Sequence, residues 1–460
     1  MKNTKKKVLV IALAVCMLAI MSFGTLAWFN AKDSVTNEFF IANSADDPDE
    51  IFSVDVWEDA TADDPDGEPK IQDGIEFDDI LPGDDLYKEV HIENTGSYPQ
   101  YVRATVTVSD ASVWQEVYGE YVVALTDIVN GLDENAIHTH VAYYDAATDS
   151  FVYELYYTAP LAVDAQYVVF ESVSIPESLD RFQAADLAGS FTISVVADAV
   201  QTENVGANVY EAFKTVGLVK AIAISDPADL AAALASEDEA YLVINETALN
   251  NGTLAIDSAI KNKTLDFNGL NAVVTFSANA SAENVVITGI VDTDGAVPSI
   301  QTNSAFTGDL TVNNCSFIDA AGQPYGAAVF AGGNITVDDC QFEGIGKSYA
   351  IYSTQSNGDI TVTDSSFKNL GSWAIQINGK ANGDVTIDNC VFETPDGVLK
   401  ILSGVDGDFT FTNNTMVGVK GHDANPDKIL VSGSGSGPVS ATGIKTVTGN
   451  TLDGNAWTQA

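Results

Sequence analysis

The sequence predicts an all-β protein in which an antiparallel β-sandwich is followed by a parallel β-helix with a short N-terminal capping helix. Downstream of residue 260, apolar pairs flank a recurring Gly, Asn or Asp, and from Gly289 to Asn389 that residue returns every 25 positions. Such a period is typical of stacked coils that bury their apolar faces against one another. Upstream, short alternating segments lack this period. We therefore expect a sandwich at 28–205, a linker at 206–221 and the β-helix at 222–460.

The recurring residue marks a bend between two strands. Gly, Asn and Asp accept a positive φ, which most other residues avoid. Alternating pairs such as Leu310 and Val312 precede the bend and predict one strand, and a second apolar pair follows it. A third strand in each coil is indicated by pairs such as Ile375 and Ile377. The eight bend positions are Gly269, Gly289, Asn314, Asp339, Asp364, Asn389, Asn413 and Gly449.

Three strands per coil of about 25 residues, joined by such bends, resemble the right-handed parallel β-helix of pectate-lyase-like proteins. The first coil of a solenoid of this kind needs a cover, and residues 225–240 predict an amphipathic helix for that purpose. Asp226 would cap this helix and Pro227 would take its first position. Leu230 and Leu234 would then share its apolar face.

The N-terminus predicts export. A cluster of lysines precedes an apolar run at residues 8–23, and small residues follow at the positions that a signal peptidase recognises. This pattern is typical of a secretory signal peptide, here residues 1–27, cut between Ala27 and Trp28. The apolar run is too short for a stable membrane span. We expect a secreted chain at the cell surface or in an extracellular matrix, with signal peptidase as a partner during export and no stable span after processing.

The chain is strongly acidic, with 20 Lys and Arg against 65 Asp and Glu and a formal net charge of −45 at pH 7. Nucleic acids and anionic membranes would repel it, so neither is expected as a partner. The acidic run at 63–67 superficially suggests a calcium loop, but Ala62 stands at the first ligand position of that motif. We therefore expect no cofactor, and calcium binding has no supporting motif.

Between the signal and the solenoid, short segments alternate between apolar and polar residues. Turn residues separate these segments and no helical pattern intervenes. Short strands of this kind favour an antiparallel sandwich, of which a jelly roll is one variety. The predicted strands span residues 51–57, 86–93, 101–109, 138–144, 151–158, 167–174 and 191–199.

Several motifs in this part of the chain carry a family resemblance. They are residues 24–30 (GTLAWFN) leading to 35–39 (VTNEF), 81–84 (LPGD), 94–97 (NTGS), 101–103 (YVR), 197–201 (ADAVQ) and 212–213 (AF). In combination they resemble TasA and camelysin-type proteins, the exported biofilm-matrix proteins of Gram-positive bacteria. The resemblance covers roughly residues 5–215. It implies a jelly-roll-like, TasA-type sandwich, a dedicated signal peptidase, and a structural or adhesive role in which the chain self-assembles into fibres, decorates them or binds other matrix proteins.

Two interpretations stay open for the segment after the predicted cleavage site, residues 28–41. Val35, Asn37 and Phe39 alternate along it, as in a strand. The segment could add as a strand to an open sheet edge of another molecule, or it could pair within its own sandwich.

Right-handed β-helices often host polysaccharide lyases and hydrolases, which need a basic residue beside a carboxylate or a pair of acids. The two arginines, Arg103 and Arg181, both precede the solenoid. The outward row predicted for the third strand has no carboxylate pair and consists of Phe330, Tyr352, Gln376 and Lys400. We therefore predict no catalytic residue and a displayed surface that binds polysaccharide through Tyr352, Gln376 and Lys400. The alternative is an extracellular carbohydrate-active enzyme that uses the β-helix.

The histidines and cysteines offer little further chemistry. His138 and His140 would share one face of a strand, but the chain lacks a His-Glu-x-x-His motif, so no metal site is predicted. Cys315, Cys340 and Cys390 fall in one inward column. Strands of adjacent coils lie about 4.8 Å apart, so Cys315 and Cys340 could form a disulfide. Free buried thiols that fill the core are the interpretation we favour.

A row of threonines is predicted on the outer face of the solenoid. Its members are Thr311, Thr336, Thr361, Thr386 and Thr410. Threonine suits an exposed strand and can bond to the next coil, which makes the row first a structural ladder. A flat array of this kind could also bind a crystalline glycan or ice, although charged residues in the neighbouring row disfavour ice.

Overall fold

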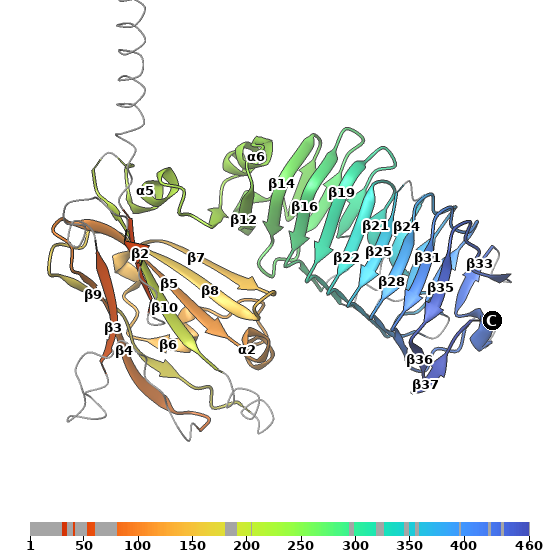
Figure 1. The fold of residues 1–460 in the computed structure, drawn as a ribbon, viewed down its shortest axis with the longest axis horizontal. Coiled ribbons are helices and arrows are strands. Elements are labelled where there is room, and N and C mark those ends of the chain that lie inside the picture. The colour runs from red at the N-terminus through yellow and green to blue at the C-terminus, as the bar shows by residue number, and fades with distance from the viewer. Residues whose placement is uncertain are drawn as a thin grey trace, which may run out of the picture. The chain divides into compact units, whose positions relative to one another are not determined.

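The computed structural model of the chain divides into two compact units, residues 1–118 with 123–219, and residues 119–122 with 220–460 (Figure 1). The predicted signal peptide with its cleavage site at Ala27 and Trp28, the acidic run 63–67, Arg181 and the alternating Val35, Asn37 and Phe39 lie outside the residues that the structure describes. The described residues are 30–34, 40–41, 53–59, 81–179, 191–203, 205–293, 299–318, 326–344, 349–354, 358–394, 397–421, 425–433 and 437–459.

The first unit holds two antiparallel sheets in its described part. A six-stranded sheet has the order β2-β1-β10-β5-β8-β7, and a four-stranded sheet has the order β3-β4-β9-β6. All seven predicted strands are confirmed, with bounds that differ by a few residues. The strands are β1 Asn30–Ser34, β2 Phe40–Ile41, β3 Val54–Asp59, β4 Asp85–Asn94, β5 Gln100–Ser109, β6 Val129–Asn130, β7 Ile137–Asp145, β8 Ser150–Tyr157, β9 Gln166–Ser174 and β10 Ile193–Gln201.

The prediction that this unit lacks helices was wrong. The chain forms α2 Ala111–Tyr118, α3 Leu125–Ile128 and the 3₁₀ turn η2 Glu134–Ala136. In α2, Ala111 and Trp114 are buried at a spacing of three residues, which anchors one short face of the helix. Helices this short present too few turns for a clear helical period in the sequence.

Helix α5, Val209–Thr215, lies where the sequence predicted a linker. The side chain of Asn208 caps it by accepting a hydrogen bond from the backbone N–H of Glu211 at 2.9 Å. Val209, Ala212 and Phe213 share one face and are fully buried. That face packs on strands of the six-stranded sheet, which explains why β8 is buried on both of its faces.

The second unit is a parallel β-solenoid whose strands stack from green to blue in Figure 1. Sheet 1 contains β11 Ala221–Ile224, β12 Ala240–Ile244, β14 Ala259–Asp266, β16 Ser281–Thr288, β19 Thr307–Asn313, β22 Asn334–Asp338, β25 Ile360–Thr363, β28 Val385–Asp388, β31 Phe409–Thr412 and β35 Lys445–Thr448. Sheet 2 contains β17 Val291–Asp292, β20 Ser316–Ile318, β23 Gln341–Glu343, β26 Ser366–Lys368, β29 Val391–Glu393, β32 Thr415–Met416, β36 Asn450–Leu452 and β37 Asn455–Trp457. Sheet 3 contains β13 Thr253–Ile256, β15 Val273–Phe276, β18 Ile300–Thr302, β21 Gly326–Phe330, β24 Tyr349–Ser353, β27 Ile375–Ile377, β30 Leu399–Ile401, β33 Leu430–Ser432 and β34 Gly437–Pro438.

The solenoid core is built from columns of like residues, one from each coil. Parallel pairing without a register shift keeps Leu310, Ile335 and Ile360 in one inward column of sheet 1. In sheet 2 four phenylalanines stack, with ring centroids 4.8–4.9 Å apart. These rings are Phe317, Phe342, Phe367 and Phe392. Each coil thus buries its apolar face only against its neighbours, as the period predicted.

The predicted capping helix is confirmed and is shorter than expected. Helix α6 spans Pro227–Ala235, and the side chain of Asp226 accepts from the backbone N–H of Ala228 at 2.7 Å. Leu230 of this helix belongs to the solenoid core. The helix ends early because residues 240–244 are needed for β12, the second strand of sheet 1. At the other end, β34 and β37 turn back antiparallel on β33 and β36.

Candidate functional site

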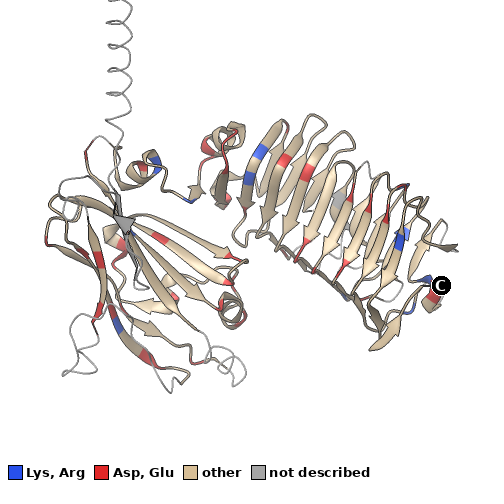
Figure 2. Cartoon of the chain, viewed as in Figure 1, with Lys and Arg blue, Asp and Glu red and all other residues tan. Residues whose placement is uncertain are grey.

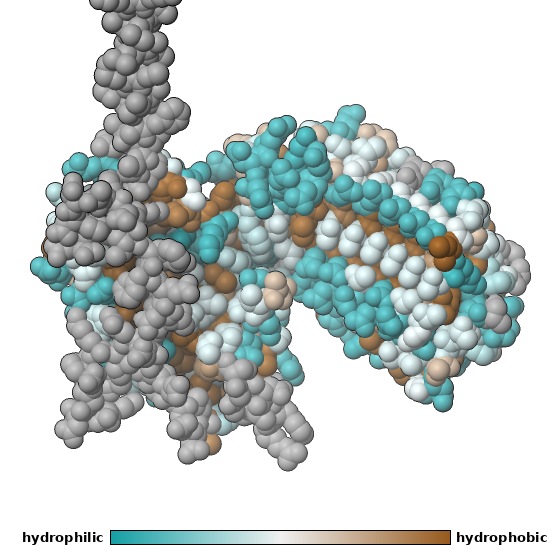
Figure 3. Space-filling view, viewed as in Figure 1, coloured by the Kyte–Doolittle hydropathy of each residue, from teal (hydrophilic) through white to brown (hydrophobic). Residues whose placement is uncertain are grey.

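The outer face of sheet 1 carries the predicted threonine row. Strand pairing places Thr311, Thr336, Thr361, Thr386 and Thr410 side by side on successive coils, and the row continues to Thr446. All six side chains are half-buried. Figure 3 shows a band of pale residues, of intermediate hydropathy, running across the coils of the solenoid. This row presents one hydroxyl per coil at the spacing of a β-sheet.

The neighbouring outward row is a hydrogen-bonded ladder of carboxylates and their donors. Thr363 Oγ1 donates to Asp338 Oδ1 at 2.5 Å, and Thr412 Oγ1 donates to Asp388 Oδ1 at 2.5 Å. The amides of Asn313 and Asn413 donate to the same two acids. Acidic residues are more widespread than basic ones over the solenoid (Figure 2). In this row, however, Asp338 and Asp388 already serve as acceptors for the coils beside them.

All eight bend positions have a positive φ, between +47° and +81°. Two of them also donate to an aspartate of the coil before. Asn389 Nδ2 donates to Asp364 Oδ1 at 2.5 Å, and Asn413 Nδ2 donates to Asp388 Oδ1 at 2.9 Å. Burial, together with the neighbouring Asp338 and Asp364, raises the pKa of Asp339. The bend residues thus fix the backbone and link coils to one another.

A second polar column follows the bend on its inner side, where the sequence indicated only residues that fill the core. The backbone N–H of Cys340 donates to Ser365 Oγ at 3.1 Å, and that of Cys390 donates to Asn414 Oδ1 at 2.9 Å. Asn414 N–H in turn donates to Asn450 Oδ1 at 2.9 Å. Each of these side chains therefore satisfies a buried donor on the coil before it.

The three cysteines of this column are free and buried. Each thiol points to the backbone carbonyl two residues earlier, as Cys340 Sγ does to Asp338 O at 3.2 Å. Burial raises the pKa of Cys390 to about 12 and raises that of Cys340 as well. The thiols of Cys340 and Cys390 therefore stay protonated and act as weak hydrogen-bonding groups.

A ladder of Gly-Asx pairs, which the sequence had not led us to expect, lies at the start of five consecutive strands of sheet 1, from β19 to β31. Asp359 Oδ1 accepts the backbone N–H of Asp384 at 2.8 Å, and Asp384 Oδ1 accepts that of Asp408 at 2.8 Å. A Cβ on Gly383 would clash with Asp359 Oδ1, which explains the glycine before each acid. The signal was present as a Gly-Asx dipeptide at the same period as the bends. It begins at Gly308, Gly333, Gly358, Gly383 and Gly407.

The predicted ligand-facing row on sheet 3 is only partly accessible. Tyr352, Gln376 and Lys400 are in register on successive strands. Tyr352 and Gln376 are each 7% exposed, whereas Lys400 is half-buried. The placement of Phe330 in this row was wrong. It pairs with Ser353 and is 2% exposed, because the residue opposite Tyr352 is Val329.

Asp266 is the most deeply buried carboxylate on the outer side of sheet 1. Tyr241 Oη donates to its Oδ2 at 2.7 Å and the backbone N–H of Asn268 donates to its Oδ1 at 2.8 Å. Despite these two bonds, burial raises the pKa of Asp266 to about 6. The carboxyl group is therefore easier to protonate in the folded solenoid than in the unfolded chain.

We expect this carboxyl to make the solenoid more stable in mild acid. Its pKa is raised on folding, so the stabilisation is full below the unfolded value of about 4 and is lost as the pH rises through about 6. A shift of about two units corresponds to about 3 kcal/mol. The free energy of unfolding, measured with denaturant from pH 4 to pH 7, should depend less on pH in Asp266→Asn than in the parent. The exposed control Asp257→Asn should keep the pH dependence of the parent. Equal slopes in Asp266→Asn and the parent would contradict this assignment.

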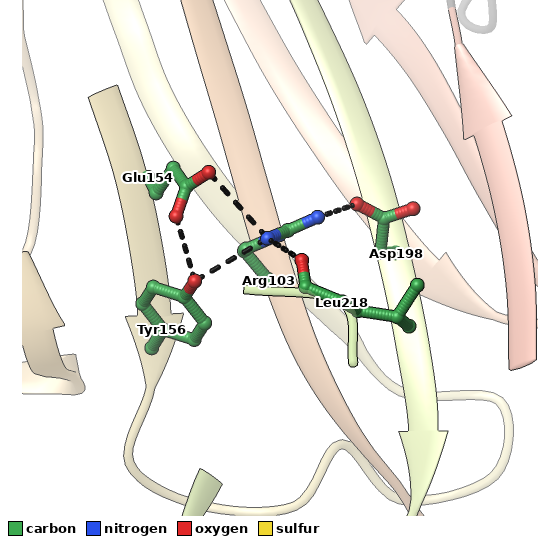
Figure 4. A network of polar contacts seen from close by, with 5 residues as sticks. All are labelled: Arg103, Glu154, Tyr156, Asp198 and Leu218. Atoms are coloured by element: carbon green, nitrogen blue, oxygen red, sulfur yellow. Dashed lines mark hydrogen bonds and ion pairs between the residues drawn. The ribbon is translucent and has the colours of Figure 1, made fainter. Parts of the chain in front are cut away.

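In the first unit, residues from three of the motifs behind the family resemblance, Arg103, Asp198 and Phe213, meet in one buried network. Figure 4 shows Arg103 with its polar partners. Arg103 Nη2 donates to Asp198 Oδ2, and Nη1 donates to Leu218 O at 2.8 Å and to Tyr156 Oη at 3.3 Å. Glu154 Oε1 lies 3.5 Å from Nη1. The guanidinium carbon is 5.2 Å from the ring centroid of Phe213 on α5. Burial lowers the pKa of Arg103, but the neighbouring acidic groups together more than offset this, so the charge is retained.

Two further motifs, residues 81–84 and 94–97, form turns. Gly96 N–H donates to Asn94 Oδ1 at 2.9 Å, and Asn94 Nδ2 donates to Leu161 O at 2.9 Å. Asp84 Oδ2 accepts the backbone N–H of Leu81 at 2.7 Å. These contacts fix loop geometry, and they give the motif residues a structural role within the unit.

His138 and His140 both lie on β7, the edge strand of the six-stranded sheet, and both are exposed. His138 Nδ1 is 3.1 Å from Thr139 Oγ1. Within the described residues, no group of three or more His, Cys, Asp or Glu side chains is placed to hold a metal ion. Nor does any helix among those residues have the length and apolar character needed to cross a membrane.

Comparison with known proteins identifies part of the second unit. Residues 250–416 match the family described as the right-handed β-helix region, and they form a solenoid of about six turns. No curated protein and no solved structure matches the chain.

Proposed function

We propose that this chain is an exported structural or adhesive protein of an extracellular matrix, whose solenoid binds polysaccharide on the outer face of sheet 1 without cleaving it. The observation that carries the proposal is the row of six outward threonines on successive coils. Hydroxyls repeated at strand spacing can bond to a polymer whose own hydroxyls repeat along its length. The row is uncharged, which suits a neutral or mildly acidic glycan.

The first part of the chain supports the extracellular assignment. The N-terminal pattern of lysines, apolar run and small residues is that of an export signal. The motif resemblance to TasA and camelysin-type proteins favours a jelly-roll-like sandwich and a biofilm matrix of a Gram-positive bacterium as the setting. In that setting the chain assembles into fibres with copies of itself or with other matrix proteins, or decorates them.

Within residues 28–41, the described residues 30–34 and 40–41 pair inside their own sheet. Strand β1 pairs antiparallel with β10 over five residues, and β2 pairs with β1. This pairing closes the β10 side of the sheet within the molecule. Strand donation between copies would therefore require β1 to leave its own sheet first.

Binding without cleavage is favoured by the condition of the carboxylates beside the threonine row. A glycosidase needs one carboxyl free to protonate the leaving group and a second free to act on water or sugar. Asp338 and Asp388 instead accept bonds from threonine and asparagine side chains, and Asp359 and Asp384 accept backbone N–H groups. These acids are committed to holding coils together.

The test compares polysaccharide binding by the purified protein and by the triple variant Thr361→Val, Thr386→Val and Thr410→Val. Valine keeps the β-branched shape and removes the hydroxyl. Each lost hydrogen bond is worth about 1 kcal/mol, so we expect binding to weaken at least about tenfold in a depletion assay with a panel of neutral and acidic polysaccharides. The control carries Thr415→Val and Thr451→Val on the outer face of sheet 2 and should bind as the parent does.

The same samples distinguish the alternative of a carbohydrate-active enzyme. Reducing ends and unsaturated products are followed during the incubation. Sustained turnover would overturn the structural assignment, and unchanged binding by the triple variant would overturn the choice of sheet 1.

A further inference from the structure

The six-stranded sheet of the first unit ends in an edge strand, β7, that has few of the features that usually protect such an edge. Strand β7 pairs with β8 on one side, and among the described strands none pairs with it on the other. Natural edge strands are commonly short, or carry proline, lysine or a bulge that discourages a further strand. Strand β7 is nine residues long, lacks proline and lysine, and has one register irregularity, at Ile137 and Thr139. Its backbone is therefore a template for one more strand.

Strand β7 carries less charge than the strongly acidic chain as a whole. The chain carries 65 acidic residues and a net charge of −45, so two copies repel each other over most of their surfaces. Strand β7 has one charged side chain, Asp145 at its end. Two copies that meet along this strand therefore bring few like charges together.

We propose that β7 is an interface with a second copy of this chain, in which the two β7 strands pair antiparallel about a two-fold axis at Val141. Antiparallel pairing about this residue places Val141 opposite itself and His140 opposite Ala142 of the second copy. Thr139 then faces Tyr143, His138 faces Tyr144, and Ile137 faces Asp145. No two like charges meet, and the patch is complementary to itself, as a two-fold interface requires.

This inference rests on the assembling role in the proposed function and names the surface that would carry it. It differs from strand donation by residues 28–41, because no strand leaves its own sheet. The two six-stranded sheets would instead join edge to edge into one continuous sheet. The interface is small and mostly backbone in character, so the dimer should be reversible in the micromolar range.

The test uses the exposed position His140. In the proposed pairing, the two His140 side chains are diagonal neighbours across the axis, within reach of long side chains. His140→Lys and His140→Glu should each weaken dimerisation at least about tenfold, since like charges then approach each other. An equimolar mixture of the two variants should recover the dimer, because opposite charges meet across the axis. Recovery on mixing also shows that both variants are folded.

Sedimentation velocity is measured on the purified protein, expressed from its complete coding sequence, from about 1 to 100 µM, the range for a small interface. The control Thr148→Lys lies on the exposed turn after β7, adds the same charge, and should sediment as the parent does. A monomeric parent at all concentrations, or unchanged association in both His140 variants, would overturn the interface. Polysaccharide binding by the same variants is expected to stay at the parent level, so loss of this interface and loss of the proposed binding function are separate outcomes.

Discussion

Replacing Arg103 with alanine is expected to lower the free energy of unfolding of the first unit by about 3–5 kcal/mol. Arg103 is 3% exposed, and its partners Asp198 and Glu154 are 7% and 1% exposed. The substitution would leave two buried carboxylates without their cation, and α5 would lose the guanidinium that contacts Phe213. Denaturant unfolding, followed by the aromatic near-ultraviolet signal of this unit, measures the loss.

The matched control is a surface ion pair on α5, the helix whose Phe213 lies against Arg103. Lys214 and Glu211 are 4.0 Å apart and both are about half exposed, so Lys214→Ala should change the free energy of unfolding by about 0.5 kcal/mol or less. Arg103→Lys keeps the charge but loses the planar guanidinium group. Its loss of unfolding free energy should therefore lie between the losses in Arg103→Ala and Lys214→Ala. A loss below about 1 kcal/mol in Arg103→Ala would show that the two carboxylates do not depend on this cation.

Replacing Phe367 with alanine is expected to cost the solenoid about 3–5 kcal/mol. Its ring is fully buried between Phe342 and Phe392, with centroid distances of 4.9 and 4.8 Å. Neighbouring coils cannot close the cavity, because each is held in register by its own strands on both sides. Native-state hydrogen exchange should show the largest loss of protection in the coils on either side of the substitution.

Two variants on β26 distinguish the effect of the cavity left by Phe367→Ala from the effect of any substitution on this strand. Phe367→Met keeps most of the volume and should cost less than about 1.5 kcal/mol. Ser366→Ala lies on the outer face of β26 and should be nearly neutral, within about 0.5 kcal/mol. If Phe367→Ala were no more destabilising than Ser366→Ala, the phenylalanine stack would not be a main source of stability.

The solenoid could be predicted from the sequence in considerable detail because its period repeats every local signal. One alternating pair, such as Ile360 and Val362, is a weak indication of a strand. The same pair at the same offset from a bend in coil after coil fixes strand, face and register together. The capping helix could be predicted for a similar reason, since Asp226 and Pro227 are both strong start signals.

Register was harder to predict where the period fails. Phe330 was assigned to an outward row, although the lengths of sequence between coils of sheet 3 vary and a shift of one residue reverses the face. Its apolar character indicated an inward position, which the strand pairing bears out. The burial of Tyr352 and Gln376 could not be predicted, because it depends on what surrounds them in space and not on their own strand.

The network around Arg103 shows a different limit. The sequence motifs included Arg103, Asp198 and Phe213, but nothing in their order indicated that they contact one another. They meet because β5 and β10 pair and α5 folds over them, contacts separated by about 95 and 110 positions in the chain. Glu154 and Tyr156, which complete the network, belong to no motif and are placed by the pairing of β5 with β8.

The polar column inside the bend gives the solenoid a direction. Ser365, Asn414 and Asn450 each accept a backbone N–H from the coil before, and the N–H of Asn414 is in turn accepted by Asn450. The acceptor for a buried N–H of this column is thus supplied by the coil that follows. A coil that carries such a side chain can follow any coil that offers the same N–H at this position. A gene for such a protein can lengthen by duplicating whole coils, without new chemistry at the joints.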